Sequence, residues 1–355
     1  MPRGKCLKGA LKEKESNMKI AIVGLGVAGS YLLNVLSKDH DVVGYEMQQE
    51  GQFDAVCAWG SSKVELSSIF SRIGVEFSGY VLFDGGTLQI ELSQKTLEIP
   101  LKGLAAYDKH QLELDLTKGK NANYGVRVSR ETFPYSKYDL VIDATSLQRA
   151  LLPRIKEQML VPCVEYMIDY HEHGMTPYND FFVKPFPRNS GYFWYFPLGD
   201  HVAYVGAGDY FRKHNDVLDA FNSEHGGTIK KKIGRPVRLS SPFLCQPFSQ
   251  GNVVGVGESI GTVFPILGEG IIPSLHCAEL LVENLEAIPQ YEVSVLKKFK
   301  VFHDVYRLIK LKINDELSTL RHARLMWNTY QTMRTQEDRF GMKVKLNDLR
   351  AIIKG

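Results

Sequence analysis

The sequence has 355 residues and a formal net charge of +3, with 44% hydrophobic and 23% charged residues. These values are typical of a folded globular protein of about two domains and exclude an intrinsically disordered chain. No stretch reaches the roughly 18 consecutive apolar residues of a membrane-spanning helix, and the five cysteines form no C-x-x-C pair, so we expect no metal site, no disulfide framework and a cytoplasmic location.

Residues 1–17 differ from the rest of the chain. They contain five basic residues and two acidic ones, with no apolar segment that would indicate a secretory signal. We expect them to be a disordered extension or a wrongly assigned start, with Met18 as an alternative first residue.

The most informative stretch begins at residue 19 and reads KIAIVGLGVAGS. Residues 20–23 form a short, β-branched apolar run that predicts a buried parallel strand. Gly24, Gly26 and Gly29 follow with G-x-G-x-x-G spacing at the expected start of a helix. In such a turn the first glycine permits the tight bend, the second lets a pyrophosphate approach the backbone, and the third lets helix and strand pack closely. Free N–H groups at the helix start then attract the phosphates.

A second strand is predicted at residues 41–46 and ends in Glu46. A carboxylate at this point can accept hydrogen bonds from an adenosine ribose. Strand, glycines, helix, strand and acid in this order predict an ADP-binding βαβ unit, whereas the glycines alone would fit any tight turn.

In the centre of the chain the pattern of apolar and polar residues changes. We expect a helix at residues 63–73, short antiparallel strands at 75–101, a helix at 107–116, and strands at 124–128 and 138–145. Residues 161–250 are rich in aromatic residues and short β-like runs, which predicts an antiparallel sheet. Glu165 and Asp169 could form a carboxylate cluster there, although solvated surface charge is the default expectation.

A buried-strand pattern returns at residues 253–258, and a helix is predicted from about 273 to 285. Beyond Tyr291 the chain is expected to be helical, with one apolar face. Core packing is the default for that face and membrane contact is the alternative. Residues 297–355 contain fourteen basic and six acidic residues, so this region could bind an anionic membrane surface; no nucleic-acid motif accompanies it. The apolar face consists of Val295, Phe299, Phe302, Tyr306, Ile309 and Ile313.

Four separated motifs resemble those of the geranylgeranyl reductase family. They are GLGVAGS at the first turn, DLVIDATS at 139–146, GYFWYFPLG at 191–199, and GVGESIGTVFPILGEGI at 255–271. The third resembles the family's Y-x-W-x-F-P signature, and the loop at 54–60 with Cys57 resembles its cysteine-containing loop near the flavin. The resemblance covers residues 18 to about 290.

The resemblance implies an α/β fold with a discontinuous Rossmann-type FAD-binding domain at 18–150 and 251–290, including a small β insertion at about 75–101. An antiparallel β-sheet substrate domain at 151–250 would be inserted into it, and 291–355 would be a helical C-terminal region. The implied cofactor is FAD.

The resemblance also assigns residues to roles. Cys57 would be the proton donor or an orienting group beside the flavin, with a small buried hydrophobe as the alternative. Asp143 would lie near the cofactor. The implied FAD-binding residues are Gly24, Gly26, Ala28, Gly29, Glu46, Ala144, Thr145, Gly257, Glu258, Gly268, Gly270 and Ile271. The implied substrate pocket consists of Trp59, Tyr192, Trp194, Phe196 and Pro197, with Trp59 at its mouth.

The function implied by the resemblance is FAD-dependent saturation of C=C bonds in geranylgeranyl or other polyprenyl chains, with hydride transfer from flavin N5. The partners would be a polyprenyl lipid and an electron donor, either NAD(P)H or a ferredoxin-like protein, with peripheral membrane contact through the basic C-terminal region. Three alternatives stay open: a flavin monooxygenase or halogenase of an aromatic compound, an NAD-dependent dehydrogenase, and a non-catalytic flavin- or lipid-binding protein.

Overall fold

The structure is a computed structural model that describes residues 17–52, 55, 57–93 and 95–340, without the side chains of 336–340. The predicted N-terminal extension lies outside the described residues except for Asn17, and so do residues 341–355 of the predicted helical region.

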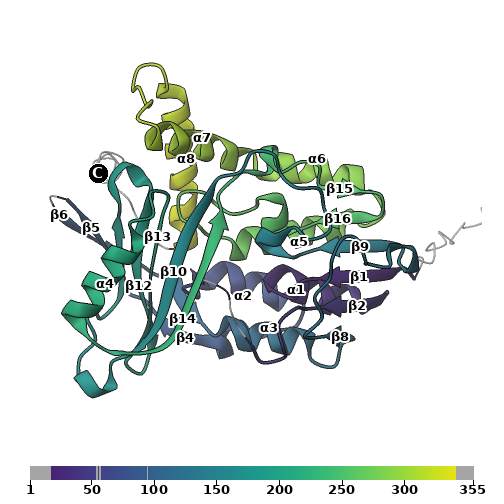
Figure 1. Cartoon of the computed structure of the whole chain (residues 1–355), viewed down its shortest axis with the longest axis horizontal. Coiled ribbons are helices and arrows are strands. Elements are labelled where there is room, and N and C mark those ends of the chain that lie inside the picture. Colours follow the sequence, from purple (N-terminus) through teal and green to yellow (C-terminus); the bar gives the residue numbers. More distant parts are fainter. Residues whose placement is uncertain (1–16, 53–54, 56, 94, 341–355) are drawn as a thin grey trace, which may run out of the picture.

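A six-stranded sheet forms one half of the described chain (Figure 1), in the order β15-β16-β9-β1-β2-β8. Strand β1 pairs in parallel with β2 on one side and β9 on the other. Ile20, Ala21 and Ile22 are fully buried, as expected for a strand covered on both faces. The strands are β1 Lys19–Val23, β2 Asp41–Tyr45, β8 Ala122–Asn123, β9 Leu140–Asp143, β15 Ser249–Gln250 and β16 Val253–Gly255.

Helices cover this sheet. Helix α1 (Val27–Leu36) packs against α3 (Lys109–Thr117) and α5 (Ile271–Glu283), and α5 also contacts α2 (Lys63–Ser71) and α6 (Ile288–Lys298). The expected helices at 63–73, 107–116 and 273–285 are therefore present with shifted ends. The expected strand at 124–128 is not, because Gly125 has φ +71° and the chain leaves the sheet after β8.

A seven-stranded sheet forms the other half of the described chain, in the order β14-β10-β13-β12-β11-β5-β6. Its long strands β10 and β14 run diagonally between the two halves (Figure 1). Helix α4 (His214–His225), which the sequence pattern did not predict, packs on β13, β12 and β10. The strands are β5 Thr87–Leu92, β6 Lys95–Pro100, β10 Leu160–Asp169, β11 Phe181–Pro185, β12 Gly191–Gly199, β13 Val202–Asp209 and β14 Thr228–Arg238.

The segment predicted as a small insertion at 75–101 is divided between two sheets. Strands β5 and β6 form an antiparallel hairpin, and β5 pairs in parallel with β11, so the hairpin extends the seven-stranded sheet. The preceding strand β4 (Val81–Asp84) instead joins a three-stranded sheet, with β3 (Gly60–Ser62) and β7 (Leu104–Tyr107).

The C-terminal part is helical as predicted, but it is not one continuous helix. Helix α6 ends at Lys298, α7 spans Lys300–Ile313, and α8 spans Ala323–Phe340. The predicted apolar face faces inward: Val295, Phe299, Tyr306, Ile309 and Ile313 are each at most 5% exposed. This face therefore packs into the protein core, and the alternative expectation that it contacts a membrane was wrong.

Candidate active site

The first glycine turn is built as its spacing predicts. Gly24 has φ +93°, and a Cβ there would lie 2.5 Å from the carbonyl oxygen of Ala144. A Cβ on Gly29 would lie 1.8 Å from the carbonyl oxygen of Gly24, which explains the close approach of helix and strand. A Cβ on Gly26 would meet nothing within 4 Å. The start of α1 is therefore open where a phosphate would bind.

The late glycine turn lies beside the early one. Gly257 has φ +70°, and a Cβ there would lie 3.0 Å from Ser274 Oγ and 3.8 Å from Ala28 Cβ. Residues 24–29, the end of β9 and the residues after β16 thus meet at one edge of the six-stranded sheet. In open α/β sheets, ligands bind outside the carboxyl ends of the strands.

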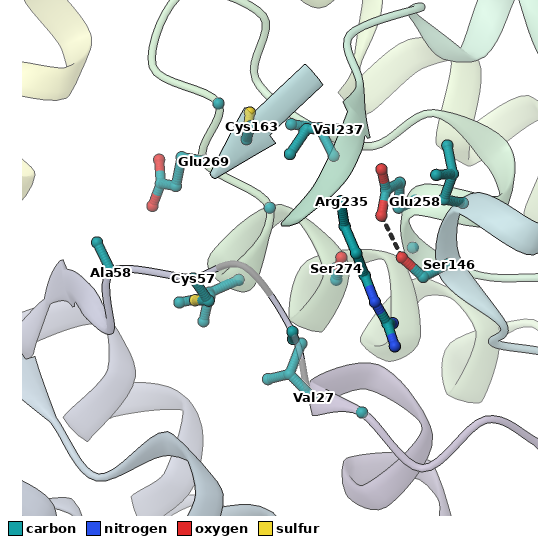
Figure 2. A pocket seen from close by; sticks show the side chains of 18 of the residues that line it. Val27, Cys57, Ala58, Ser146, Cys163, Arg235, Val237, Glu258, Glu269 and Ser274 are labelled. Carbon is teal, nitrogen blue, oxygen red and sulfur yellow. Dashed lines mark hydrogen bonds between the residues drawn. The ribbon is translucent and has the colours of Figure 1, made fainter. Parts of the chain in front are cut away.

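One cavity of about 880 Å³ starts at these turns and extends to the seven-stranded sheet and α8. Its size is within the range of small-molecule sites. Figure 2 shows Val27, Ser146 and Ser274 on one side of the pocket, and Cys57, Ala58 and Glu269 on the other. The predicted residues that line it are Gly24, Gly26, Ala28, Glu46, Cys57, Ala144, Thr145, Tyr192, Trp194, Phe196, Gly257, Glu258, Gly268, Gly270 and Ile271.

Four predicted positions do not line this cavity. Gly29 packs against Gly24. Pro197 lies on β12, where side chains alternate between faces, and it is on the opposite face from Trp194 and Phe196. Asp143 is fully buried, and its carboxylate accepts hydrogen bonds from the backbone N–H groups of Thr145, Leu151 and Leu152, so it holds the loop after β9.

Trp59 is the fourth of these positions, and the expectation that it shapes the pocket mouth was wrong. Its ring contacts Tyr204 edge to face, with ring centroids 5.0 Å apart, and the residue is only 7% exposed. Trp59 has φ +59°, which directs its side chain into this separate cluster while its neighbours Cys57 and Ala58 line the pocket.

Glu46 and Glu258 line the pocket near the two glycine turns. Glu46 accepts hydrogen bonds from the backbone N–H groups of Leu25 (2.8 Å) and Gln48 (3.0 Å), which fixes its side chain beside the first glycine turn. Glu258 accepts from the backbone N–H of Arg238 at 2.8 Å and from the hydroxyl of Ser146 (Figure 2). Burial raises the pKa of Glu258 above its usual value.

Cationic groups also line this end. Lys109 forms an ion pair with Glu113 one helical turn later on α3, so its charge is already compensated. Arg235 on β14 extends its guanidinium into the pocket on the side where α1 begins (Figure 2), and it forms no hydrogen bond or ion pair with the described residues. The sequence pattern did not single out Arg235, because it lies in a strand with three neighbouring lysines.

Cys57 lines the pocket beside Ala58 (Figure 2). Burial raises the pKa of its thiol to about 11, with a smaller opposing effect of Lys109. Its backbone N–H donates to Glu165 at 3.0 Å. Glu165 is 2% exposed, so the expectation of solvated surface charge was wrong, and Asp169 instead pairs with His171 and Lys230 at the surface.

The apolar end of the pocket has walls from strands of the seven-stranded sheet and from the helices α7 and α8. The hairpin β5–β6 contributes Leu88, Ile90 and Ile99, and β12 contributes Trp194 and Phe196. In the same sheet β10 contributes Val161 and Cys163, β14 contributes Val237, and Leu239 follows the end of β14. The helices contribute Leu308 and Ile309 of α7 and Tyr330 and Met333 of α8. The alternating pattern of β10 and β14 could have indicated their wall residues, but no sequence signal indicated those of α8.

The fold and the joined glycine turns define the class: the protein has the fold of an FAD-dependent oxidoreductase. The donors at the turns fit this cofactor, because an open helix start, a guanidinium and a carboxylate lie where the pyrophosphate and the adenosine ribose of FAD would bind. Within the described residues, no three His, Cys, Asp or Glu side chains gather as a metal site would require, and no helix is long and apolar enough to cross a membrane.

Comparisons with known proteins agree with this class. No protein-family model matches the chain. An uncharacterized protein of Methanocaldococcus jannaschii is 23% identical over 335 residues, which cover 79% of this chain and 88% of that protein. A digeranylgeranylglycerophospholipid reductase of Picrophilus torridus is 30% identical over 166 residues, so the alignment spans 41% of each chain.

Solved structures show the same fold. A geranylgeranyl bacteriochlorophyll reductase-like protein of Thermoplasma acidophilum superposes with a TM-score of 0.65 at 16% identity, covering 92% of this chain and all of that one. A probable FAD-dependent monooxygenase of Pseudomonas aeruginosa has a TM-score of 0.60 at 14% identity, covering 88% of this chain and all of that one. The predicted fold class and the resemblance to geranylgeranyl reductases are confirmed, as is FAD as the cofactor that the fold carries.

Proposed function

We propose that the protein is an FAD-dependent reductase that saturates C=C bonds of geranylgeranyl or other polyprenyl chains. The observation that carries this proposal is the continuity of one pocket, which joins the glycine turns to an apolar channel between β5–β6, β12 and α8. A hydrocarbon chain binds mainly by burial, at about 25 cal/mol per Å², and such walls suit it. The partial similarity to the Picrophilus reductase supports the same substrate class.

In this proposal the cofactor lies along the edge of the six-stranded sheet. Gly24, Gly26, the start of α1 and Arg235 would hold the pyrophosphate, and Glu46 would hold the adenosine ribose. The backbone around 268–271, which lines the same pocket, would then contact the isoalloxazine ring. The start of α5, with its positive dipole end, can stabilise negative charge there.

The chain supplies the proton and the dry surroundings. Bound FAD, when reduced, supplies a hydride from N5 to one alkene carbon. Cys57 holds a proton on Sγ at neutral pH, because burial raises the pKa of its thiol to about 11, and it is our candidate to protonate the other carbon. NAD(P)H or a ferredoxin-like protein would reduce the cofactor, and the basic C-terminal region would contact the membrane that holds the lipid.

A flavin monooxygenase or halogenase is the second candidate, because solved enzymes of both kinds share the fold. Such an enzyme would consume oxygen and modify an aromatic compound. The NAD-dependent dehydrogenase alternative is less well supported, because it gives no role to the late glycine turn that lines the same pocket.

An anaerobic single-turnover experiment tests the proposal. The yellow protein is reduced with dithionite and mixed with a geranylgeranyl lipid. We expect the flavin absorbance to return while the lipid gains two mass units per saturated bond. Flavin that stays reduced with every prenyl lipid tested, or oxygen consumption coupled to a hydroxylated or halogenated product, would reject the lipid reductase.

The role of Cys57 is tested in the same assay. Cys57→Ala is expected to slow reoxidation about 100-fold, the range for loss of a general acid, without loss of bound flavin. Cys245→Ala is the matched control, because Cys245 is fully buried outside the pocket. Equal rates for wild type and Cys57→Ala would assign Cys57 to packing alone.

A further inference from the structure

Glu165 lies on β10, the second strand of the seven-stranded sheet, and its side chain is on the face that the pocket uses. It belongs to β10, which pairs with β13 on one side and β14 on the other. Side chains alternate along a strand, and Val161 and Cys163 on the same face of β10 line the pocket. A carboxyl group that is only 2% exposed needs partners, because an unpaired buried polar group is costly.

Both carboxyl oxygens have such a partner, and the partners come from two different motifs. Glu165 Oε1 accepts a hydrogen bond from the backbone N–H of Cys57 at 3.0 Å, and Oε2 accepts from Trp194 Nε1 at 3.1 Å. Cys57 comes from the loop before β3 and Trp194 from β12. One carboxyl group therefore joins the cysteine loop to the aromatic wall of the pocket.

A glycine makes the second contact possible. Gly206 on β13 is in register with both Glu165 on β10 and Trp194 on β12, so it lies between them in the sheet. A Cβ on Gly206 would lie 2.3 Å from Trp194 Cζ2 and 2.8 Å from Nε1. Without that Cβ, the indole can lie across β13 and reach Glu165.

We infer that Glu165 is a positioning residue: its carboxyl group holds the backbone of Cys57 and the indole of Trp194 in a fixed relation, so that the thiol stays beside the apolar channel. The catalytic importance of this positioning rests on the proposed function, in which Cys57 is the proton donor. The positioning itself is argued from the two hydrogen bonds that Glu165 accepts and from the space that Gly206 leaves for the indole. Any negative charge on Glu165 also disfavours the thiolate of Cys57.

The groups around Glu165 set its ionisation. Burial dominates and raises the pKa of Glu165 to about 8, against the two hydrogen bonds and the positive charge of Lys231 on β14. The carboxyl group is thus largely protonated at neutral pH and ionises as the pH passes about 8. The titratable groups whose own ionisation Glu165 opposes are Cys57, Cys163, Tyr192 and Tyr204.

Labelling of Cys57 in the substrate-free holoprotein tests the inference without any lipid. Alkylation by iodoacetamide is followed by mass spectrometry of the Cys57 peptide between pH 6 and pH 10. In Glu165→Gln, which keeps the shape of the neutral acid, we expect labelling at pH 9 to be at least threefold faster than in wild type, because the opposing charge is gone. Equal labelling rates at pH 9 would overturn the inference.

Gly206→Ala tests the hydrogen bond between Trp194 and Glu165 without removing the carboxyl group of Glu165. The added Cβ displaces the indole from Glu165 while Glu165 and Cys57 stay unchanged. We expect single-turnover reoxidation by geranylgeranyl lipid to slow at least tenfold at pH 6.5, with FAD affinity within twofold of wild type. An unchanged rate would reject the positioning role.

If wild type itself shows no turnover, the proposed function fails, while the labelling result still decides the Glu165 contact. Trp194→Phe, which removes the indole N–H donor and keeps a smaller aromatic ring, repeats the test if Gly206→Ala does not fold.

Discussion

Arg235 shows how a single side chain can complete a cofactor site. Its guanidinium enters the pocket near the start of α1, without a partner among the described residues. A charge-assisted contact to pyrophosphate contributes about 1.5–3 kcal/mol. Arg235→Gln is therefore expected to weaken FAD binding about tenfold or more, measured by flavin fluorescence quenching.

The control for this prediction is Arg154→Gln, which removes the same charge from an exposed position outside the pocket. Its dissociation constant for FAD should match that of wild type. The dependence of binding on salt should also weaken in Arg235→Gln alone, because one ionic contact is lost. A dissociation constant that is the same in both variants would place Arg235 away from the pyrophosphate.

Single residues were the least predictable part of the site. Glu46 and the three glycines were predictable because each serves one local backbone geometry. Trp59 and Glu165 were not, because their environment depends on strands far apart in the sequence: Tyr204 on β13 contacts Trp59, and Trp194 on β12 contacts Glu165. A side chain's exposure follows from such non-local pairing, which periodicity cannot reveal.

The βαβ element gives a matched pair of substitutions. Gly29→Ala puts a Cβ 1.8 Å from the carbonyl oxygen of Gly24, so α1 must move away from β1, and overpacking of this kind costs about 1–3 kcal/mol. Gly26→Ala meets nothing within 4 Å, and its φ of −67° suits alanine. The new methyl group lies only where the pyrophosphate would be.

We therefore expect the two variants to fail differently. The apoprotein of Gly29→Ala should melt several degrees lower than wild type, whereas that of Gly26→Ala should melt within about a degree of it but bind FAD at least tenfold more weakly. Thermal unfolding with and without FAD gives both quantities. A loss of apoprotein stability in Gly26→Ala would contradict this assignment of roles.

Elements with local signals were predicted, and elements defined by long-range pairing were not. The strands β1, β2, β9 and β16 and the helices α1, α2, α3 and α5 follow from apolar runs and glycine turns. The hairpin β5–β6 was recognised as antiparallel, but its parallel pairing with β11 brings together residues about 90 positions apart, such as Leu88 and Phe181. Helix α4 was missed because its segment lies within a β-rich region.

At the scale of the whole molecule, the pocket exists only because separate parts of the chain close around it. The six-stranded sheet provides the glycine turns, the seven-stranded sheet provides the aromatic wall, and α7 and α8 add further lining residues. Helix α8 lies far from β2 (Figure 1). FAD that contacts both sheets should therefore stabilise them together. The helices that close the channel should limit the length of the chain it accepts.

Met333 on α8 tests that limit. It is half-buried and lines the pocket together with Ile309 of α7. Met333→Trp fills the far end of the channel, so under the proposed function we expect KM for a geranylgeranyl lipid to rise at least tenfold, while KM for a geranyl analogue changes less than twofold because the shorter chain does not reach α8. The matched control is Met326→Trp on the same helix, at a half-buried position outside the pocket, which should alter neither constant. Equal increases for both chain lengths in Met333→Trp would mean that the substrate enters past α8 instead of ending there, and the direction of the channel would have to be reversed.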